Sequence, residues 1–397
     1  MSDAAPTTSR PPWDRLQRAA LIAGAAGLLV CAGGGVLSPA HFFRAYLTAY
    51  NFWLGVALGC LVLLMVQHLT GGAWGILLRR VLEAGTRTLL PLALLFVPLF
   101  FGMTHLYEWA NPQAVQADEE LQRKSGYLNV TGFAVRTVIY FVVWLAIASL
   151  LNKWSAQQDQ GGHDEDAERR FRLLSAPGLA LYGGTITFAS IDWVMSLEPH
   201  WASTIYPVLF AVGQALEGIA FAVVALVLLS EYPPLAEVVR ASHRRDLGNL
   251  LLTFVMLWAY MGFSQFLLIW AENLPEETPW YLRRLRGGWE WVAVLLLVFQ
   301  FVLPFVLLLF RDVKENPRRL AGVATLILVM RFVDVLWWVE AAFPGGMSFY
   351  WLLDVAALVG LGGIWVWCFL WQLGKRPQLP LHDPYLPMYL PEAAHHG

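Results

Sequence analysis

The sequence predicts an all-α, polytopic membrane protein, and this prediction depends on its composition and on its apolar segments. Of its 397 residues, 57% are hydrophobic and only 14% are charged, whereas soluble domains carry about 25% charged residues. About ten apolar segments follow one another, each near the ~20 residues that cross a hydrocarbon layer of about 30 Å. Since every backbone N–H and C=O must find a partner inside such a layer, we expect each segment to be an α-helix.

The apolar segments place the expected membrane domain at residues 16–373. It follows a short polar segment, residues 1–15, contains one hydrophilic loop at 152–175, and precedes a polar tail, residues 374–397. The loop includes "QQDQGGHDED", whose composition is typical of poorly ordered chain. The expected spans lie at about 16–37, 46–69, 88–110, 131–151, 176–198, 204–230, 247–272, 288–311, 319–343 and 348–373.

Basic residues divide unequally between the two sets of loops. Of the 27 Lys and Arg, 19 fall in the N-terminal segment, in alternate loops such as "RRVLEAGTR" and "VVRASHRR", and in the C-terminal "GKRP". Seven fall in the opposite set, among them Arg283, Arg284 and Arg286, and only Arg331 remains at mid-membrane. Because cytoplasmic loops carry the excess of Lys and Arg, we expect the N-terminal segment, the 152–175 loop and the C-terminal tail in the cytoplasm.

Several classes of protein have no support in the sequence. The net charge of −2 indicates no nucleic-acid partner. The three cysteines lie in apolar runs without a C-x-x-C spacing, and of the nine His only His105 lies well within an expected span. Iron–sulfur clusters need cysteine motifs and membrane haems need paired axial ligands. No motif for a nucleotide, a catalytic zinc or a serine nucleophile is present. We therefore expect this chain to bind no metal and no cofactor of its own.

The most unusual feature is a set of ionisable side chains inside apolar segments. Each costs roughly 2.5 to 3.5 kcal/mol at the centre of an inserted helix, so such groups face the bundle interior and find partners there. In "LILVMRFVDVLWWVE", Arg331 and Asp334 lie three positions apart and share a helix face, which suits an ion pair, whereas Glu340 must face a different neighbour. The candidates for a proton pathway are Glu217, Arg331, Asp334, Glu340, Asp354 and Asp192.

Three interpretations of these charges stay open. A structural ion pair would lock one helix against its neighbours, a proton or quinone site would use the same groups chemically, and a substrate pathway would line a passage with them. The stretch "HLYEW" also places His105 and Glu108 on one face near the outer end of the third span. Capping of the helix and a functional imidazole–carboxylate pair are both compatible with that position.

Three longer blocks carry a resemblance to a known family. They are "RAYLTAYNFWLGVALGCLVLLMVQHLTGGAWGILLRRVLEA" at 44–84, "FGMTHLYEWANP" at 101–112 and "ASIDWVMSLEPHWASTIYP" at 189–207. These blocks closely resemble the ActF subunits of alternative complex III, which are related to the NrfD-like, quinone-binding membrane subunits. The resemblance runs from the second to the tenth expected span. It implies ten transmembrane helices arranged as two four-helix bundles with two additional helices.

The resemblance also implies a cellular role. Such a subunit lies in the bacterial inner membrane, within a complex that oxidises quinol, including menaquinol. Electrons then pass through iron–sulfur clusters and c-type haems of other subunits to a periplasmic carrier or a terminal oxidase. The implied partners are an ActC-like quinone-binding subunit, an iron–sulfur subunit, a multihaem cytochrome c subunit and, as an acceptor, a terminal oxidase.

The resemblance points to candidate residues as well. In ActC a His and an Asp from neighbouring helices are expected at the quinol site, and His105 and Asp192 are the matching residue types here. The proton passages proposed for the family suit Glu217, Arg331 and Asp334, and also Asp354. We therefore expect proton conduction or coupling, rather than quinol oxidation, in this chain.

A purely structural membrane anchor and a secondary transporter are the alternatives. A transporter predicts inverted repeats with broken helices at matching positions in both halves. The third span is interrupted by Pro91 and Pro98, and no matching segment recurs six or seven helices later. An anchor would keep the buried polar residues as hydrogen-bonding groups between helices.

Overall fold

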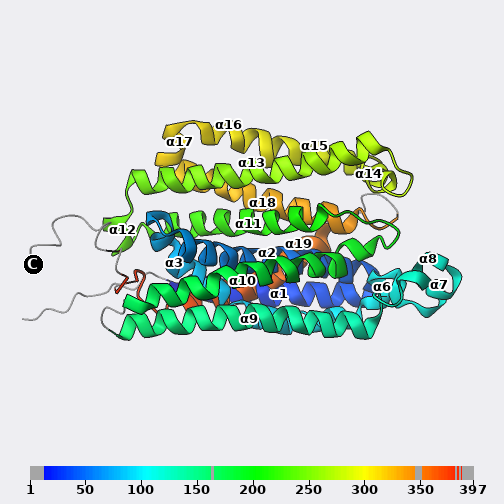
Figure 1. Cartoon of the computed structure of the whole chain (residues 1–397), viewed down its shortest axis with the longest axis horizontal. Coiled ribbons are helices and arrows are strands. Elements are labelled where there is room, and N and C mark those ends of the chain that lie inside the picture. Colours follow the sequence, from blue (N-terminus) through cyan, green and yellow to red (C-terminus); the bar gives the residue numbers. More distant parts are fainter. Residues whose placement is uncertain (1–12, 162–164, 345–350, 381, 384–385, 387–397) are drawn as a thin grey trace, which may run out of the picture.

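The protein is built from long helices that lie side by side (Figure 1). The computed structural model describes residues 13–161, 165–344, 351–380, 382–383 and 386. Every regular element among these residues is helical, so the expected all-α fold is confirmed, and nine of the helices are long and apolar enough to cross a membrane. They are α1 (Trp13–Leu37), α2 (Pro39–Thr70), the series α3 to α5 (Trp74–Phe101), α9 (Val130–Gln160), α11 (Tyr206–Leu229), α13 (Ala241–Glu272), the series α15 to α16 (Trp289–Leu309), α18 (Pro317–Glu340) and α19 (Trp351–Leu373).

A further long helix, α10 (Glu165–Trp193), packs against α2, α9 and α11. It corresponds to the expected span at 176–198. Its first turns, "EDAERRFR", are polar, and its apolar part contains the small and hydroxyl-bearing stretch "GGTIT". These residues lower the hydropathy of α10. Its length and its packing among the long helices nevertheless match those of the nine apolar helices.

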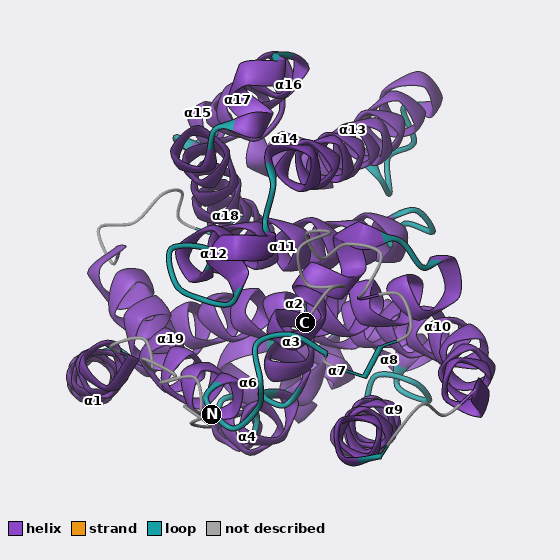
Figure 2. Cartoon of the chain, turned by 90° about the vertical axis from the view of Figure 1, so that its left-hand side faces the viewer, coloured by secondary structure: helices purple, strands orange, loops and turns teal. Residues whose placement is uncertain are grey.

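The contacts between the long helices define two four-helix bundles and a flanking pair, whose arrangement is visible in Figure 2. The first bundle contains α2, the series α3 to α5, α9 and α10, and the second contains α11, α13, the series α15 to α16 and α18. Helices α2 and α11 pack on each other and join the two bundles, while α1 and α19 form a pair that packs against α2. This arrangement agrees with the one that the family resemblance implied.

The short connecting elements gather at two ends of the molecule, which we call the α12 end and the α14 end (Figure 1). At the α12 end, Trp13 at the start of α1 packs on Tyr232 with ring centroids 6.1 Å apart. Two basic segments of the set expected in the cytoplasm, "VVRASHRR" and "RDVKENPRR", lie at this end. The short helices concerned are α12 (Leu235–Val238) and α17 (Arg311–Glu315) at the α12 end, and α6 (Met103–Leu106), α7 (Pro112–Ala117), α8 (Glu119–Lys124) and α14 (Thr278–Arg284) at the α14 end.

The third membrane helix begins and ends earlier than we expected. The expected span was 88–110, whereas the observed span is Trp74–Phe101. Most of "RRVLEAGTR", expected as a cytoplasmic loop, lies in α3 (Ala73–Thr86) and is buried. Its charges are tolerated there because Arg79 and Arg80 pair with Glu83 and also with Asp159 of α9 and Asp383 of the tail. His105 consequently lies beyond the span, in α6, and is exposed.

The expected hydrophilic loop at 152–175 is also wrong over most of its length. Helix α9 continues to Gln160 and α10 begins at Glu165. Asn152 and Ser155 are buried because they hydrogen-bond to α3, which explains how polar residues extend α9. Of the stretch expected to be poorly ordered, residues 157–160 are helical, and residues 162–164 lie outside the described residues.

Glycines allow two pairs of helices to approach closely. A Cβ atom at Gly27 of α1 would lie 2.6 Å from the backbone nitrogen of Gly360 in α19. Likewise a Cβ at Gly218 of α11 would lie 2.5 Å from the carbonyl carbon of Gly59 in α2. Small residues at membrane helix interfaces maximise van der Waals contact between backbones. The α1–α19 pair and the α2–α11 junction between the bundles are therefore fixed by backbone contact.

Candidate functional site

Three ionisable side chains meet inside the second bundle, and we call them the midplane trio. Arg331 and Asp334 lie on α18, Glu217 lies at the middle of α11, and each is only 1% exposed. Glu217 Oε1 accepts hydrogen bonds from Arg331 Nε at 3.2 Å and from Nη2 at 3.0 Å. Arg331 Nη1 donates to Asp334 Oδ2. The predicted pairing of Arg331 with Asp334 is confirmed, and Glu217 adds a second carboxylate to it.

Two neutral donors and acceptors surround the Asp334 side of the trio. The indole N–H of Trp258 on α13 donates to Asp334 Oδ2 at 3.1 Å. Gln300 is fully buried beside this indole. With its amide oriented to satisfy both neighbours, Gln300 donates to the carbonyl of Met330 at 2.9 Å and accepts from Trp258 Nε1 at 3.2 Å. Side chains from four helices therefore converge on the trio.

Gln300 is placed by a local irregularity in its helix. It lies in a π-helical turn, η3 (Leu297–Val302), between α15 and α16. Pro304 has no N–H to donate to the carbonyl of Gln300, which favours a widened turn at this point. Short π-helical segments occur frequently at functional sites, and here the turn carries a polar side chain toward the trio.

One oxygen of the trio faces the other bundle. Among the described residues, Glu217 Oε2 has no hydrogen-bond partner. A Cβ atom at Gly55 of α2 would lie 1.8 Å from this oxygen, so the absence of a side chain there leaves the space that the carboxylate occupies. One turn earlier on α11, Gln214 accepts a hydrogen bond from Tyr182 of α10 at 2.7 Å. Glu217 therefore lies at the boundary between the bundles.

The two quinone-associated candidates are not brought into contact. Asp192 is fully buried and accepts from Arg136 Nε and Nη2, both at 2.9 Å, and from the hydroxyl of Tyr140 at 2.7 Å. His105 is exposed and stacks on Phe43 with ring centroids 5.7 Å apart. Within the described part of the chain no hydrogen bond joins Asp192 to His105. Asp192 of α10 and Arg136 of α9 thus form an interhelical ion pair.

A large cavity of about 1170 Å³ opens at the α14 end, and His105 and Glu108 line it. Glu198 lies on its wall and is bound by two arginines of α14, by Arg284 at 2.7 Å and by Arg283 at 3.2 Å. Arg284 itself is 1% exposed. The basic residues expected in the non-cytoplasmic loops therefore anchor α14 to the loop that precedes α11.

Glu340 and Asp354 lie apart from the midplane trio. Glu340 ends α18 and Asp354 lies in the first turn of α19, and their charges act on each other. Arg44 attracts Glu340 and stacks on the ring of Phe343 at 3.8 Å. The expectation that Glu340 faces a different neighbour from Asp334 is confirmed.

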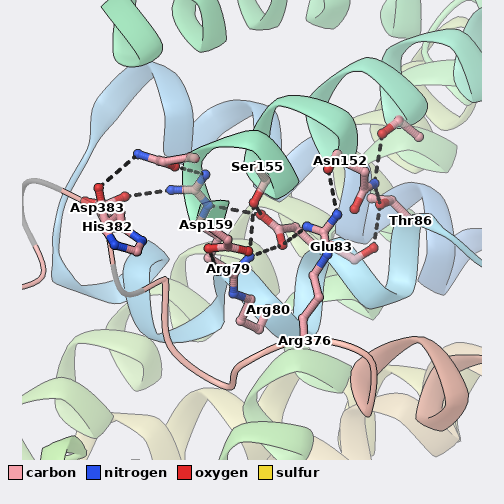
Figure 3. Close-up of polar contacts among 12 residues, drawn as sticks. Arg79, Arg80, Glu83, Thr86, Asn152, Ser155, Asp159, Arg376, His382 and Asp383 are labelled. Atoms are coloured by element: carbon pink, nitrogen blue, oxygen red, sulfur yellow. Dashed lines mark hydrogen bonds and ion pairs between the residues drawn. The ribbon is translucent and has the colours of Figure 1, made fainter. Parts of the chain in front are cut away.

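A second buried charge cluster lies at the α12 end, where the chain returns after α19 (Figure 3). We call it the tail cluster. Glu83 is 2% exposed and accepts from Arg79 at 3.0 Å, Arg80 at 2.8 Å and Ser155 at 2.6 Å. Arg376 donates to the same carboxylate at 3.3 Å. The members of the tail cluster are Arg79, Arg80, Glu83, Asn152, Ser155, Asp159, Arg376 and Asp383.

The tail cluster fastens the segment after α19 to the first bundle. Asp383 accepts from Arg79 at 2.6 Å, and Arg376 donates to the backbone carbonyl of Asn152 at 2.8 Å. Burial lowers the pKa of Arg376, and the Glu83 carboxylate opposes that effect. Opposite charges on α3, α9 and the tail thus compensate the cost of desolvation, as buried ion pairs require.

The sequence does not predict the tail cluster, because the basic residues of "RRVLEAGTR" are typical of a cytoplasmic loop. A signal for it is present in "RRVLEAGTR", since residues three and four apart share a helix face. Glu83 is three positions from Arg80 and four from Arg79, which suits a helix with compensated charges. The partners from the tail, Arg376 and Asp383, are too distant in sequence for such a rule.

Together, the helices and the buried charges define the class of this protein. It is a multi-pass helical membrane protein with paired ionisable groups at the middle of one bundle and at both ends. No protein-family model matches the chain, and no curated protein matches it at a significant level. The role of the buried charges must therefore be argued from their geometry.

Proposed function

We propose that the chain is a membrane subunit of a quinol-oxidising electron-transfer complex of the alternative complex III type, in which its second bundle conducts or couples protons. Its partners in this proposal are an ActC-like quinone-binding subunit, an iron–sulfur subunit and a multihaem cytochrome c subunit. These subunits hold the iron–sulfur clusters and haems, and quinol is the substrate of the complex. The sequence resemblance supports this assembly, and the midplane trio supports the role of the bundle.

The single observation that carries the role is the excess carboxylate of the midplane trio. One guanidinium faces two carboxylates, Glu217 and Asp334, and one oxygen of Glu217 has no partner among the described residues. An uncompensated charge at membrane depth is costly. A proton bound to the trio would cancel the excess negative charge. Binding and release of one proton there therefore changes the electrostatic free energy of the second bundle.

A line of polar groups extends from the trio toward the α14 end. Tyr206 is buried and lies within electrostatic reach of Asp334, Glu198 and Arg284. Arg284 donates to the backbone carbonyl of Trp338, one turn beyond Asp334, at 2.9 Å. Glu198 lies on the wall of the 1170 Å³ cavity. These groups support a route by which protons leave or reach the trio.

The decisive experiment measures proton yield in the assembled complex. Glu217→Gln keeps the size of the side chain and removes its exchangeable charge, so we expect fewer protons moved per electron at normal haem content. Glu231→Gln, an exposed position at the α12 end, is the matched control. Unchanged turnover and proton yield in an intact Glu217→Gln complex would exclude proton coupling through the trio and favour the structural anchor.

The proposed orientation places the α12 end in the cytoplasm of a bacterium and the α14 end on the outside. Glu231 and Glu276 are exposed at opposite ends. We expect a membrane-impermeant thiol reagent to label Glu276→Cys, but not Glu231→Cys, in intact spheroplasts. Labelling with the opposite pattern would reverse the orientation.

A further inference from the structure

A second, shallower cavity lies at the α12 end, between the end of α2 and the start of α10. Its volume is about 490 Å³. Leu69, Leu173, Ala176 and Pro177 give it an apolar floor. The side chain of Leu173 is 64% exposed. It lies three residues before the expected span at 176–198, where an exposed apolar side chain can contact lipid. The floor is therefore open to the acyl region of a bilayer.

The first turns of α10 line the cavity with charged side chains, and we call Glu168, Arg169 and Arg172 its rim. Arg169 and Arg172 lie three positions apart on α10, and both line the cavity. Glu168 lines it as well and pairs with Arg172 at 3.6 Å, with both side chains partly exposed. Among the described side chains that line the cavity, two guanidinium groups and one carboxylate leave one positive charge in excess. Arginine groups bind phosphate oxygens in a planar, directional manner.

Pro177 leaves a backbone acceptor without its helical donor in the part of α10 that lines the cavity. Pro177 lies inside α10 and has no N–H to donate to the carbonyl of Leu173. This carbonyl lacks its usual helical donor, so a hydroxyl group can donate to it. The cavity thus combines a site for a phosphate, an acceptor for a hydroxyl and an apolar floor.

We infer that this cavity binds an anionic phospholipid whose headgroup carries hydroxyls, with the phosphodiester at Arg169 and Arg172 and the first acyl methylenes on the apolar floor. Basic pockets between membrane helices are typical sites for anionic headgroups. The floor favours a lipid over free phosphate, because inorganic phosphate makes no use of Leu69, Leu173 or Ala176. This inference is independent of the proposed function.

Lipid retention by the purified full-length chain tests the inference. The protein is exchanged into detergent, incubated with phosphatidylglycerol or phosphatidylcholine, and analysed by native mass spectrometry. One basic charge in excess near an anionic headgroup contributes about a fivefold preference, so phosphatidylglycerol is expected to bind about fivefold more tightly than phosphatidylcholine. Arg169→Gln with Arg172→Gln should abolish that preference, and Glu168→Gln should increase it.

Matched variants separate this site from general charge effects. Arg318 and Arg319 are also exposed at the α12 end, on α18, and Arg318→Gln with Arg319→Gln should keep the preference. Ala176→Trp fills the floor and should weaken lipid binding while the rim stays charged. Equal retention of both lipids by the wild type, equal losses in both double variants, or stabilisation by inorganic phosphate as large as that by phosphatidylglycerol would each overturn the inference.

Discussion

Glu217 Oε1 accepts two hydrogen bonds from Arg331, at 3.2 and 3.0 Å, and so joins the α11 and α18 helices through a single buried cation. Arg331 is shared, because it also donates to Asp334 on its own helix. The trio therefore has a basic member that cannot be removed without leaving two carboxylates facing each other. This asymmetry determines which substitutions the bundle tolerates.

Removal of Arg331 should be far more damaging than removal of either acid. Arg331→Gln strands two buried carboxylates, and breaking a buried ion pair typically costs about 3–5 kcal/mol. Asp334→Asn leaves Arg331 balanced by Glu217, so its cost should be much smaller. Thermal unfolding of the purified variants in detergent measures both. Equal destabilisation by the two substitutions would contradict the shared-cation arrangement.

The α1–α19 contact should be sensitive to the addition of a few atoms. Gly27→Leu introduces a Cβ that would lie 2.6 Å from the backbone of Gly360 and adds further carbons, and overpacking costs typically 1–3 kcal/mol. At Gly33 of the same helix no atom lies within 4 Å of an added Cβ, so Gly33→Leu is the control. We expect a lower melting temperature for Gly27→Leu alone. A similar decrease for both would show that α1 tolerates no bulk at any face.

The tail cluster should depend on Glu83. Glu83→Gln removes the charge on which Arg79, Arg80 and Arg376 converge, so by the same reasoning it should cost about 3–5 kcal/mol and release the tail. The exposed Glu231 at the same end provides a control, because surface substitutions usually stay within about 0.5 kcal/mol. Trypsin cleavage after Lys375 measures release of the tail, because Pro377 blocks cleavage after Arg376. Protection that persists in Glu83→Gln would show that the tail is held by other contacts.

The Asp118 carboxylate makes the α14 end sensitive to acid. The backbone N–H of Leu121 and the side chain of His200, at 2.7 Å, hold the pKa of Asp118 below its usual value. A carboxyl group with a lowered folded pKa contributes stability above its unfolded pKa, about 3.9, and that stability is lost as pH falls through the lower folded value. Pepsin cleavage of α8 should therefore increase across this window in the wild type.

Asp118→Asn provides the control for the acid prediction. Its side-chain oxygen can still accept from the amides of Glu120 and Leu121, but it carries no titrating charge. The ratio of wild-type to variant cleavage at each pH removes the pH dependence of pepsin itself. A ratio that stays constant between neutral pH and pH values below the pKa of Asp118 would show that the charge is unimportant.

Local patterns predicted much of this structure. Apolar segments of membrane length identify the long helices, and the spacing of Arg331 and Asp334 identifies their ion pair, because both depend on residues close in sequence. The third span was displaced because Arg79 and Arg80 were counted as loop charges. Their neutralisation comes partly from Asp383, which pairs with Arg79 and follows α19 in the sequence.

The rest of the candidate site depends on contacts between distant segments. Nothing local indicates that Glu217 shares Arg331 with Asp334, or that Gly55 leaves space for its second oxygen. Residue type alone suggests that His105 and Asp192 share a site. In the structure Arg136 pairs with Asp192, and His105 lies beyond the third membrane span. Packing of the whole bundle determines which helices are neighbours, and the neighbouring helices determine these contacts.

The close contact between α1 and α19 has a consequence for how the protein is made. Ribosomes synthesise α1 long before α19, and Gly27 and Gly360 must meet backbone to backbone. Until α19 is synthesised, the glycine face of α1 lacks the helix on which it packs, and α2 is the other described long helix with which α1 makes extensive contact. Before α19 is inserted, α1 must therefore stay in the bilayer with its glycine face covered by the insertion machinery or by a chaperone. A nascent chain halted before residue 351 should expose α1 to crosslinking with that machinery, whereas the finished chain should not.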